Sequence, residues 1–276
     1  MTASPKKILF VNSEMSPFLP DSRMATLSRQ LPQAVQELGK EIRSFMPRYG
    51  CINERRNQLH EVIRLSGMNI IIKDIDRPLI IKVASISAAR MQVYFIDNDD
   101  YFHRRFINAD ADGHFFEDND ERAIFFVRGV LETVKKLRWK PDLVHCNGWL
   151  SHMLPIYLKK AYNDDPLFSQ TKVVLSLYND VPHEAFDSNM RSKALIPGVK
   201  NKDLELLATP DTTQLTKLAM QYSNGIIFGD ENIRPEIVEH LKGLNLPFLP
   251  FIDPANPETP YTEAYNKFYD QILETK

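Results

Sequence analysis

Short apolar runs rich in β-branched and aromatic residues alternate with segments of helical periodicity along this chain. This alternation predicts an α/β fold with a doubly wound, mostly parallel sheet, because right-handed crossovers place helices on both of its faces. The expected architecture is Rossmann-like. Ligands of such sheets bind beyond the carboxyl ends of the strands, so a site is expected in the segments that follow them.

The first half of the chain opens with a predicted buried strand, KILFVNS (7–13). A helix is expected from Arg23 to Leu38, with Gly39 as its stop, because apolar residues recur there at helical spacing. The next strand is EIRSFMP (41–47), and 79–86 and 91–97 are expected to be neighbouring strands of a β-rich excursion. Asp118, Asn119 and Asp120 are N-cap candidates for a helix that runs through Leu137.

The second half continues the alternation, with strands predicted at 142–147, 172–179 and 225–229 and helices at 151–162 and 233–241. The tail contains a Pro-punctuated linker and an amphipathic helix. Its expected packing stripe is Tyr261, Tyr265, Phe268 and Ile272.

Composition excludes several classes of function. The 276 residues carry 34 Lys+Arg against 36 Asp+Glu, a formal charge of −2, so no basic excess attracts nucleic acid or a membrane. The chain has no signal-peptide h-region and no run of ~18 apolar residues, which predicts a cytoplasmic protein. Cys51 and Cys146 lie far apart and outside any C-x-x-C motif, which favours two buried thiols.

One acidic stretch, NADADGHFFEDN (108–119), partly matches a calcium-binding loop. Its twelfth position is Asn119 instead of the bidentate glutamate, which favours a solvated loop over a calcium site. Asp97 to Asp100 indicates a turn at a strand end. The sequence therefore predicts neither a metal site nor a cofactor.

Five segments carry a likeness to a known family: KILFVNSEMSPF (7–18), LPQAVQELGKEIRSFMPRYG (31–50), NDERAIFFVRGVLETV (119–134), PDLVHCNGWLSHMLPIYLK (141–159) and VVLSLYN (173–179). In this order they resemble the bacterial glycogen and starch synthases. The resemblance implies a retaining GT-B glycosyltransferase, which moves glucose from ADP- or UDP-glucose to an α-1,4-glucan in the cleft between two Rossmann domains.

The resemblance also implies a division of this chain. Residues 1–252 would be the first family domain, and residues 253–276 a linker and a helix that packs back on it. The length of 276 residues leaves no room for the second GT-B domain, so we expect that domain to be absent.

Three loops depart from the family's chemistry. The family's Lys-x-Gly-Gly phosphate loop becomes Pro20, Ser22 and Arg23, which removes a cation and adds Cβ atoms where a phosphate would approach. The family's aspartate becomes Gly148, and its donor-facing histidine becomes Tyr178. A loop closed by Phe18, Leu19 and Arg23 would leave no room for a phosphate.

The remaining candidates for substrate contacts are Ser22, Arg23, His145, Asn147, Trp149 and Asn179. Arg23 is either a replacement cation or a surface residue at a helix start. His145 is either a satisfied structural histidine or a ligand contact, and Trp149 either stacks on a sugar or packs inside the protein.

Three functions follow from these expectations. The favoured one is a catalytically degenerate synthase-like domain with a binding or regulatory role in glycan metabolism. The alternatives are a glucosyltransferase half that acts with a partner chain, and a glucan- or oligosaccharide-binding module. A nucleotide sugar or a glucan is the expected ligand, and a partner protein or self-association is the expected assembly.

Overall fold

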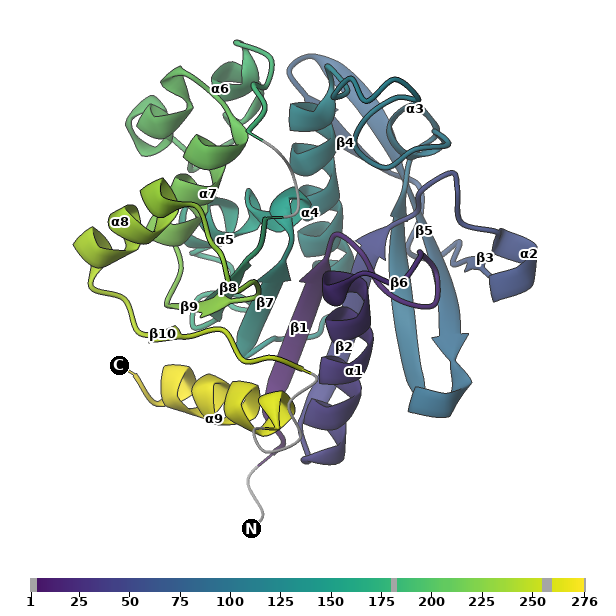
Figure 1. Cartoon of the computed structure of the whole chain (residues 1–276). Coiled ribbons are helices and arrows are strands. Elements are labelled where there is room, and N and C mark those ends of the chain that lie inside the picture. The colour runs from purple at the N-terminus through teal and green to yellow at the C-terminus, as the bar shows by residue number, and fades with distance from the viewer. Residues whose placement is uncertain (1–3, 180–182, 255–259, 276) are drawn as a thin grey trace.

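The computed structural model describes residues 4–179, 183–254 and 260–275. In this part of the chain, ten strands form one sheet in the order β10-β9-β8-β7-β1-β2-β6-β5-β3, with β4 paired to β5 (Figure 1). The strands are β1 (Lys7–Asn12), β2 (Glu41–Pro47), β3 (His60–Glu61), β4 (Met68–Ile72), β5 (Ile75–Ile86), β6 (Met91–Asp97), β7 (Leu143–Asn147), β8 (Lys172–Leu177), β9 (Gly225–Phe228) and β10 (Phe248–Leu249).

The strand directions confirm the predicted doubly wound, mostly parallel sheet. All neighbours from β10 through β1 to β6 are parallel, while β5 runs antiparallel to β6, and β3 and β4 run antiparallel to β5. In this register Asn12 at the end of β1 lies beside Asn147 at the end of β7. The carboxyl ends of the central strands therefore meet at one edge of the sheet.

Helices cover both faces of the sheet. The helices are α1 (Arg23–Glu37), α2 (Glu54–Asn57), α3 (Asp99–Phe102), α4 (Asn119–Lys136), α5 (Leu154–Lys160), α6 (Met190–Lys193), α7 (Thr212–Gln221), α8 (Pro235–Leu244) and α9 (Tyr261–Glu274), with 3-10 turns at η1 (Ser87–Ala89), η2 (Trp149–Ser151) and η3 (Asn201–Ala208). Helices α1 and α9 pack on one face with Ile8 and Phe10, and α4, α5 and α7 pack on the other with Leu9 and Val11. Because β1 is covered on both faces, its apolar residues form a continuous run without alternating polarity.

Helix α9 completes the core on the α1 face (Figure 1). The four residues of the predicted stripe, Tyr261, Tyr265, Phe268 and Ile272, are all buried. Lys40 Nζ lies 2.8 Å from a carboxylate oxygen of Asp270, which ties α9 to the turn after α1. Residues 255–259 of the expected linker lie outside the described residues.

Two predicted elements differ from the observed ones. The single helix expected at 151–162 is divided into η2 and α5, with Pro155 in the first turn of α5, where its missing N–H costs no helical hydrogen bond. The strand expected at 79–86 begins earlier, at Ile75, because it forms a hairpin with β4 that the periodicity did not reveal.

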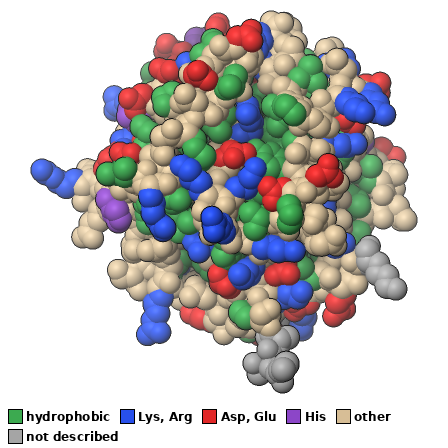
Figure 2. Space-filling model, turned by 180° about the vertical axis from the view of Figure 1, so that it is seen from behind, with side chains coloured by type: hydrophobic (Ala, Val, Ile, Leu, Met, Phe, Trp, Pro, Cys, Tyr) green, Lys and Arg blue, Asp and Glu red, His purple; other side chains and the backbone are tan. Residues whose placement is uncertain are grey.

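The two cysteines differ in their exposure to solvent. Cys146 is buried as expected, but Cys51 is exposed because it lies in the turn that follows β2, so the expectation of two buried thiols is wrong for that residue. On the face shown in Figure 2, acidic and basic side chains lie among each other. Within the described ranges, no helix is both long and apolar enough to cross a bilayer.

Candidate functional site

A chain of buried polar side chains runs across the carboxyl ends of four strands. The Asn12 side-chain amide donates to the Phe45 carbonyl at 3.4 Å, and the Asn147 amide donates to Asn12 Oδ1 at 3.0 Å. The Tyr178 hydroxyl then donates to Asn147 Oδ1 at 3.3 Å. Asn12 and Asn147 are fully buried, so these hydrogen bonds offset the cost of removing both amides from water. Asn147, a candidate substrate contact, therefore has its side-chain amide bonded to Asn12 and Tyr178 inside the protein.

The loop after β1 is closed by its own apolar side chains. Phe18 and Leu19 are both buried, and the Phe18 ring packs edge-on against Phe95 at 4.9 Å between centroids. Ser22 caps α1 by accepting a hydrogen bond from the Ala25 N–H at 2.9 Å. Its hydroxyl also donates to Glu14 Oε2 at 2.8 Å. Ser22 therefore acts as a helix cap that is already bonded to a carboxylate.

Arg23 extends from the start of α1 to the far side of the site. Its Nη1 lies 2.9 Å from Asp230 Oδ1, and its guanidinium lies 4.8 Å from the centroid of the Phe251 ring. The Asn179 N–H donates to the other Asp230 oxygen at 2.8 Å. Asp230 thus contacts two of the residues predicted to bind substrate. It forms an ion pair with Arg23 and accepts a hydrogen bond from the backbone of Asn179.

A small hollow remains beside this ion pair. It measures about 200 Å³ and is lined by Glu14, Ser22, Arg23, Met24, Tyr178 and Asp230. The charged groups that line it are the carboxylates of Glu14 and Asp230 and the guanidinium of Arg23, which is paired with Asp230. Carboxylates therefore outnumber cations among the residues that line this hollow.

Gly148 is the residue that the resemblance led us to expect in place of the family's aspartate. Its φ of +82° and ψ of 158° lie in a region that L-residues rarely adopt. A Cβ at this position would lie 2.5 Å from Ser13 Oγ and 2.8 Å from Met24 Sδ. The loop accordingly has neither the backbone conformation nor the space for a side chain.

Tyr178 is the residue that the resemblance led us to expect in place of the family's histidine. Its ring lies against Gly229, where a Cβ would overlap it. Its hydroxyl is part of the buried amide chain through Asn147.

His145 lies in the core beneath α9. Its Nε2 is 2.7 Å from Ser176 Oγ and its Nδ1 is 2.7 Å from the Tyr269 hydroxyl. Complete burial lowers the pKa of His145 to about 3, so the imidazole is neutral at pH 7. Both ring nitrogens are engaged inside the protein, which is the structural alternative of the two that the sequence left open.

Trp149 lies beneath two phenylalanines and is only 2% exposed. Phe115 and Phe186 each lie 5.7 Å from its ring, measured between centroids. The aromatic surface that reaches solvent belongs instead to a hollow of about 590 Å³ lined by Gly113, His114, Phe115, Phe116, Glu117, Glu184, Ala185, Phe186 and Asp187. The sequence reasoning missed this hollow. The available signal was the pairing of phenylalanine with acidic residues in both HFFED (114–118) and EAFD (184–187).

The partial calcium loop is organised by its own backbone. Asp110 Oδ1 accepts the N–H groups of Asp112 and His114, each at 2.9 Å. Asn119 is buried and donates to the Asn108 carbonyl at 2.8 Å. One side-chain oxygen of the partial calcium motif, Asp110 Oδ1, is therefore used in holding the turn.

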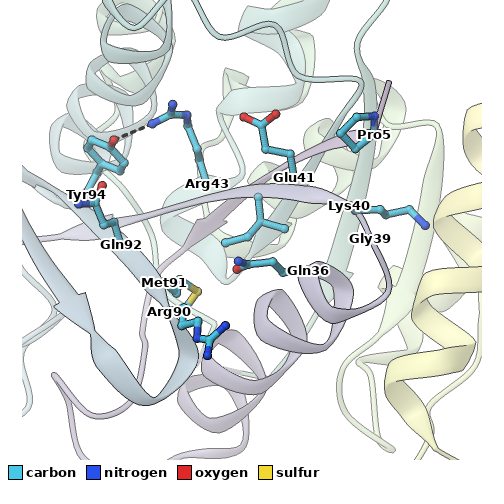
Figure 3. A pocket seen from close by; sticks show the side chains of 11 residues that line it. Pro5, Gln36, Gly39, Lys40, Glu41, Arg43, Arg90, Met91, Gln92 and Tyr94 are labelled. Carbon is cyan, nitrogen blue, oxygen red and sulfur yellow. Dashed lines mark hydrogen bonds between the residues drawn. The ribbon is translucent and has the colours of Figure 1, made fainter. Parts of the chain in front are cut away.

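Another hollow, of about 550 Å³, lies at the opposite edge of the sheet, where β2 and β6 begin. Lys40, Arg43 and Arg90 line it. Figure 3 shows that Arg43 and Arg90 extend to opposite sides of β2, and Arg43 donates to the Tyr94 hydroxyl at 2.6 Å. These cations do not converge on one ligand position.

The structure thus divides the predicted contacts into two groups. It brings Ser22 and Arg23 to the small hollow at the strand ends, and it bonds Asn147 and Asn179 to two residues that line it, Tyr178 and Asp230. It places His145 under α9 and Trp149 under the phenylalanines, with Gly148 between them as a turn.

Comparisons with known proteins agree with this architecture. The model of the starch synthase catalytic domain matches residues 7–247. The glycogen synthase of Chlorobium limicola is 41% identical over 174 residues, which are 63% of this chain and 36% of that protein. The glycogen synthase of Chlorobium phaeobacteroides is 34% identical over 253 residues, which are 86% of this chain and 52% of that protein. The chain thus spans about a third to a half of the length of these curated relatives.

A solved structure shows the same fold. The catalytic domain of starch synthase IV from Arabidopsis thaliana, bound to ADP and acarbose, superposes with a TM-score of 0.72 at 16% identity, over 93% of this chain and 54% of that one. The fold is therefore that of a GT-B catalytic domain. Together with the matches to the family model and to the glycogen synthases, it shows that this chain belongs to the starch synthase catalytic domain family and is a glycogen/starch synthase-like glycosyltransferase domain.

Proposed function

We propose that this chain does not transfer glucose by itself and has a binding or regulatory role in glycan metabolism. The observation that carries the proposal is the ion pair of Arg23 in the loop after β1. Arg23 is paired with Asp230, and a second carboxylate, Glu14, lines the same hollow. Gly148 and Tyr178 support it, because neither offers the carboxylate or the imidazole expected from the family. In this proposal residues 1–252 are the family's first domain and 253–276 its linker and returning helix.

The loss of transfer follows from electrostatics. A departing nucleoside diphosphate needs preorganised positive charge, and removal of one such donor typically lowers kcat by about 10²–10³-fold. Here the phosphate loop contributes Pro20, which has no N–H, and an arginine that is held by a carboxylate. Restoring one residue would leave the other two loops unchanged.

Calorimetric titration with ADP-glucose and UDP-glucose, together with an assay of maltooligosaccharide elongation, tests this proposal. We expect no saturable binding and no elongation. The Asp230→Asn variant is a useful comparison, because it removes a carboxylate and releases Arg23, so any residual donor binding should become stronger. Micromolar donor binding with glucan elongation by the unaltered chain would overturn the proposal.

An alternative is a glucosyltransferase half that works with a second polypeptide. It is favoured by the match of residues 7–247 to the model of a catalytic domain. It predicts that a partner with a nucleotide-sugar domain co-purifies with this chain and restores elongation. Light scattering on the isolated chain would separate such a complex from self-association. Recovery of this chain alone, with no activity after candidate partners are added, would count against the alternative.

A second candidate function is glucan binding at the aromatic hollow. Rings stack on pyranose faces, and the carboxylates of Glu117 and Glu184 accept hydrogen bonds from sugar hydroxyls. The bound acarbose of starch synthase IV, an oligosaccharide analogue, is consistent with this class of ligand.

Affinity electrophoresis in glycogen-containing gels tests this second function. We expect Phe115→Ala to abolish retardation. Phe106→Ala is the matched control, because Phe106 belongs to the same loop, is 41% exposed and does not line the hollow. Equal migration of the unaltered chain with and without glycogen would refute glucan binding.

A further inference from the structure

Two carboxylates and an imidazole meet where β6 ends. Asp97 is the last residue of β6, Asp99 opens α3, and His103 follows that helix. His103 Nε2 lies 3.3 Å from Asp97 Oδ1 and 3.0 Å from Asp99 Oδ1. All three ligand atoms lie within 4.8 Å of one another. We propose that Asp97, Asp99 and His103 form a binding site for a divalent transition-metal ion, with Zn²⁺ as the best match.

The buried carboxylate points to a ligand. The Asp97 side chain is only 1% exposed, yet neither of its oxygens has a hydrogen-bond partner among the described residues. Lys82 Nζ compensates Oδ2 with an ion-pair contact at 3.1 Å, whereas Oδ1 has only the contact with the His103 imidazole, at 3.3 Å. Leaving a buried carboxylate oxygen unsatisfied is costly, and a cation on the Oδ1 side removes this cost.

The spacing of the ligand atoms suits a metal ion. Around an ion with bonds of about 2.1 Å, ligand atoms are separated by about 3.4 Å in a tetrahedron and about 3.0 Å in an octahedron. The two distances from His103 Nε2, 3.0 and 3.3 Å, fall at these values. The imidazole therefore lies at a suitable distance from each carboxylate, and the two carboxylate oxygens lie within 4.8 Å of each other.

The chemistry of the donors selects the kind of ion. One imidazole nitrogen with two carboxylate oxygens suits Zn²⁺ and its neighbours, whereas Mg²⁺ and Ca²⁺ prefer oxygen ligands alone. Asp99 and His103 have side chains that are 75% and 39% exposed, so an ion can enter from solvent and keep a water molecule. Asp97, at the end of β6, is the buried member of the set and contacts His103.

The surrounding charges leave room for a cation. Glu54 lies 2.6 Å from Lys82 Nζ and also pairs with Arg48, whose Nε is 4.0 Å from Asp97 Oδ2. Three carboxylates, Glu54, Asp97 and Asp99, therefore face two permanent cations, Arg48 and Lys82, so the carboxylates outnumber the permanent cations by one.

A second cluster offers a matched control. Asp110, Asp112 and His114 also bring two carboxylates and an imidazole together, but all three are exposed. Asp110 Oδ1 is already used by two backbone N–H groups, and the cluster contains no buried, unsatisfied oxygen. We therefore expect the metal at Asp97 and not at Asp110.

The test is titration of chelator-treated full chain with Zn²⁺ by calorimetry, with Co²⁺ absorption as an optical readout of ligand geometry. We expect one tightly bound ion per chain and a higher Tm with Zn²⁺. Asp99→Asn and His103→Gln should each weaken binding by at least the ~100-fold that loss of an outer-shell partner can reach. The control variant His114→Gln should bind as the unaltered chain does.

Three results would overturn the proposal: no Zn²⁺ binding, binding that survives His103→Gln, or binding that is lost with His114→Gln. The first would leave the cluster as direct contacts of His103 with the two aspartates. Because the exchanged side chains lie at the surface, circular dichroism should show the fold of each variant to be unchanged. Donor binding plays no part in this test, so its outcome is separate from that of the proposed function.

Discussion

Replacing Gly148 by alanine should strongly destabilise the protein. The backbone conformation of Gly148, with φ +82° and ψ 158°, costs an L-residue about 1–3 kcal/mol. The new Cβ would also lie 2.5 Å from Ser13 Oγ and 2.6 Å from Ser13 Cβ, and overpacking of this kind costs about 1–3 kcal/mol. Ser13 Oγ accepts the Leu150 N–H at 3.2 Å, so moving it weakens a buried hydrogen bond as well. The sum is a loss of about 2–6 kcal/mol from a stability that is typically about 5–15 kcal/mol.

Urea unfolding followed by circular dichroism measures this loss. With a slope of about 3 kcal/mol per molar urea, a loss of 3 kcal/mol lowers the midpoint by roughly 1 M. Gly39→Ala is the matched control, because Gly39 also has a positive φ, +91°, but no atom lies within 4 Å of its added Cβ. Gly39→Ala should cost only about 1–2 kcal/mol, the backbone share. Equal losses in the two variants would refute the steric reasoning. Gly148→Asp, which reintroduces the family's carboxylate, should destabilise at least as much as alanine and restore no activity.

Three further predictions concern buried polar groups. The pKa of His145 is lowered to about 3 in the folded protein, from about 6.5 in the unfolded chain. The unfolded chain therefore binds more protons below pH 6.5. As a result, the free energy of unfolding should fall by up to about 1.4 kcal/mol per pH unit as the pH drops from 6.5 to 3. His145→Gln should reduce that slope in urea titrations at pH 7, 5.5 and 4.5, and an unchanged slope would contradict the assignment. Tyr269→Phe should lower the free energy of unfolding by about 1–3 kcal/mol at pH 7, because it leaves His145 Nδ1 without its partner at 2.7 Å; a loss below the error of the urea fit would argue against that bond. Lys193→Met should lower the free energy of unfolding by about 3–5 kcal/mol at pH 7, since Lys193 Nζ lies 2.9 Å from the buried Asp120. Burial raises the pKa of Asp120 to about 6, so this loss of stability should be smaller at pH 5, where the carboxyl becomes protonated. A loss that does not depend on pH would contradict the pairing.

Much of the fold could be predicted from local patterns. The helix that begins at Arg23, the strands at 41–47 and 91–97, and the buried stripe of the last helix were all visible as periodicities. The hairpin of β4 and β5 was not, because its residues Ile71 and Ile75 are exposed and break the expected alternation. The aromatic hollow was also missed, since it joins two loops about 70 residues apart in the printed sequence, at Phe115 and Phe186.

By itself, the sequence determined the order of the elements and the parallel sheet, because these depend on residue identity and short-range spacing. Its resemblance to the family also led us to expect replaced phosphate-loop, aspartate and histidine positions. Only the tertiary structure decided what the replacing side chains do. Arg23 meets Asp230 across 207 positions of the chain, and His145 meets Tyr269 across 124. Asp97 and His103 are close in sequence, yet the burial that leaves Asp97 Oδ1 without a partner comes from the packed sheet around it. Pairings of this kind depend on how distant segments pack, and no local pattern of residues encodes them.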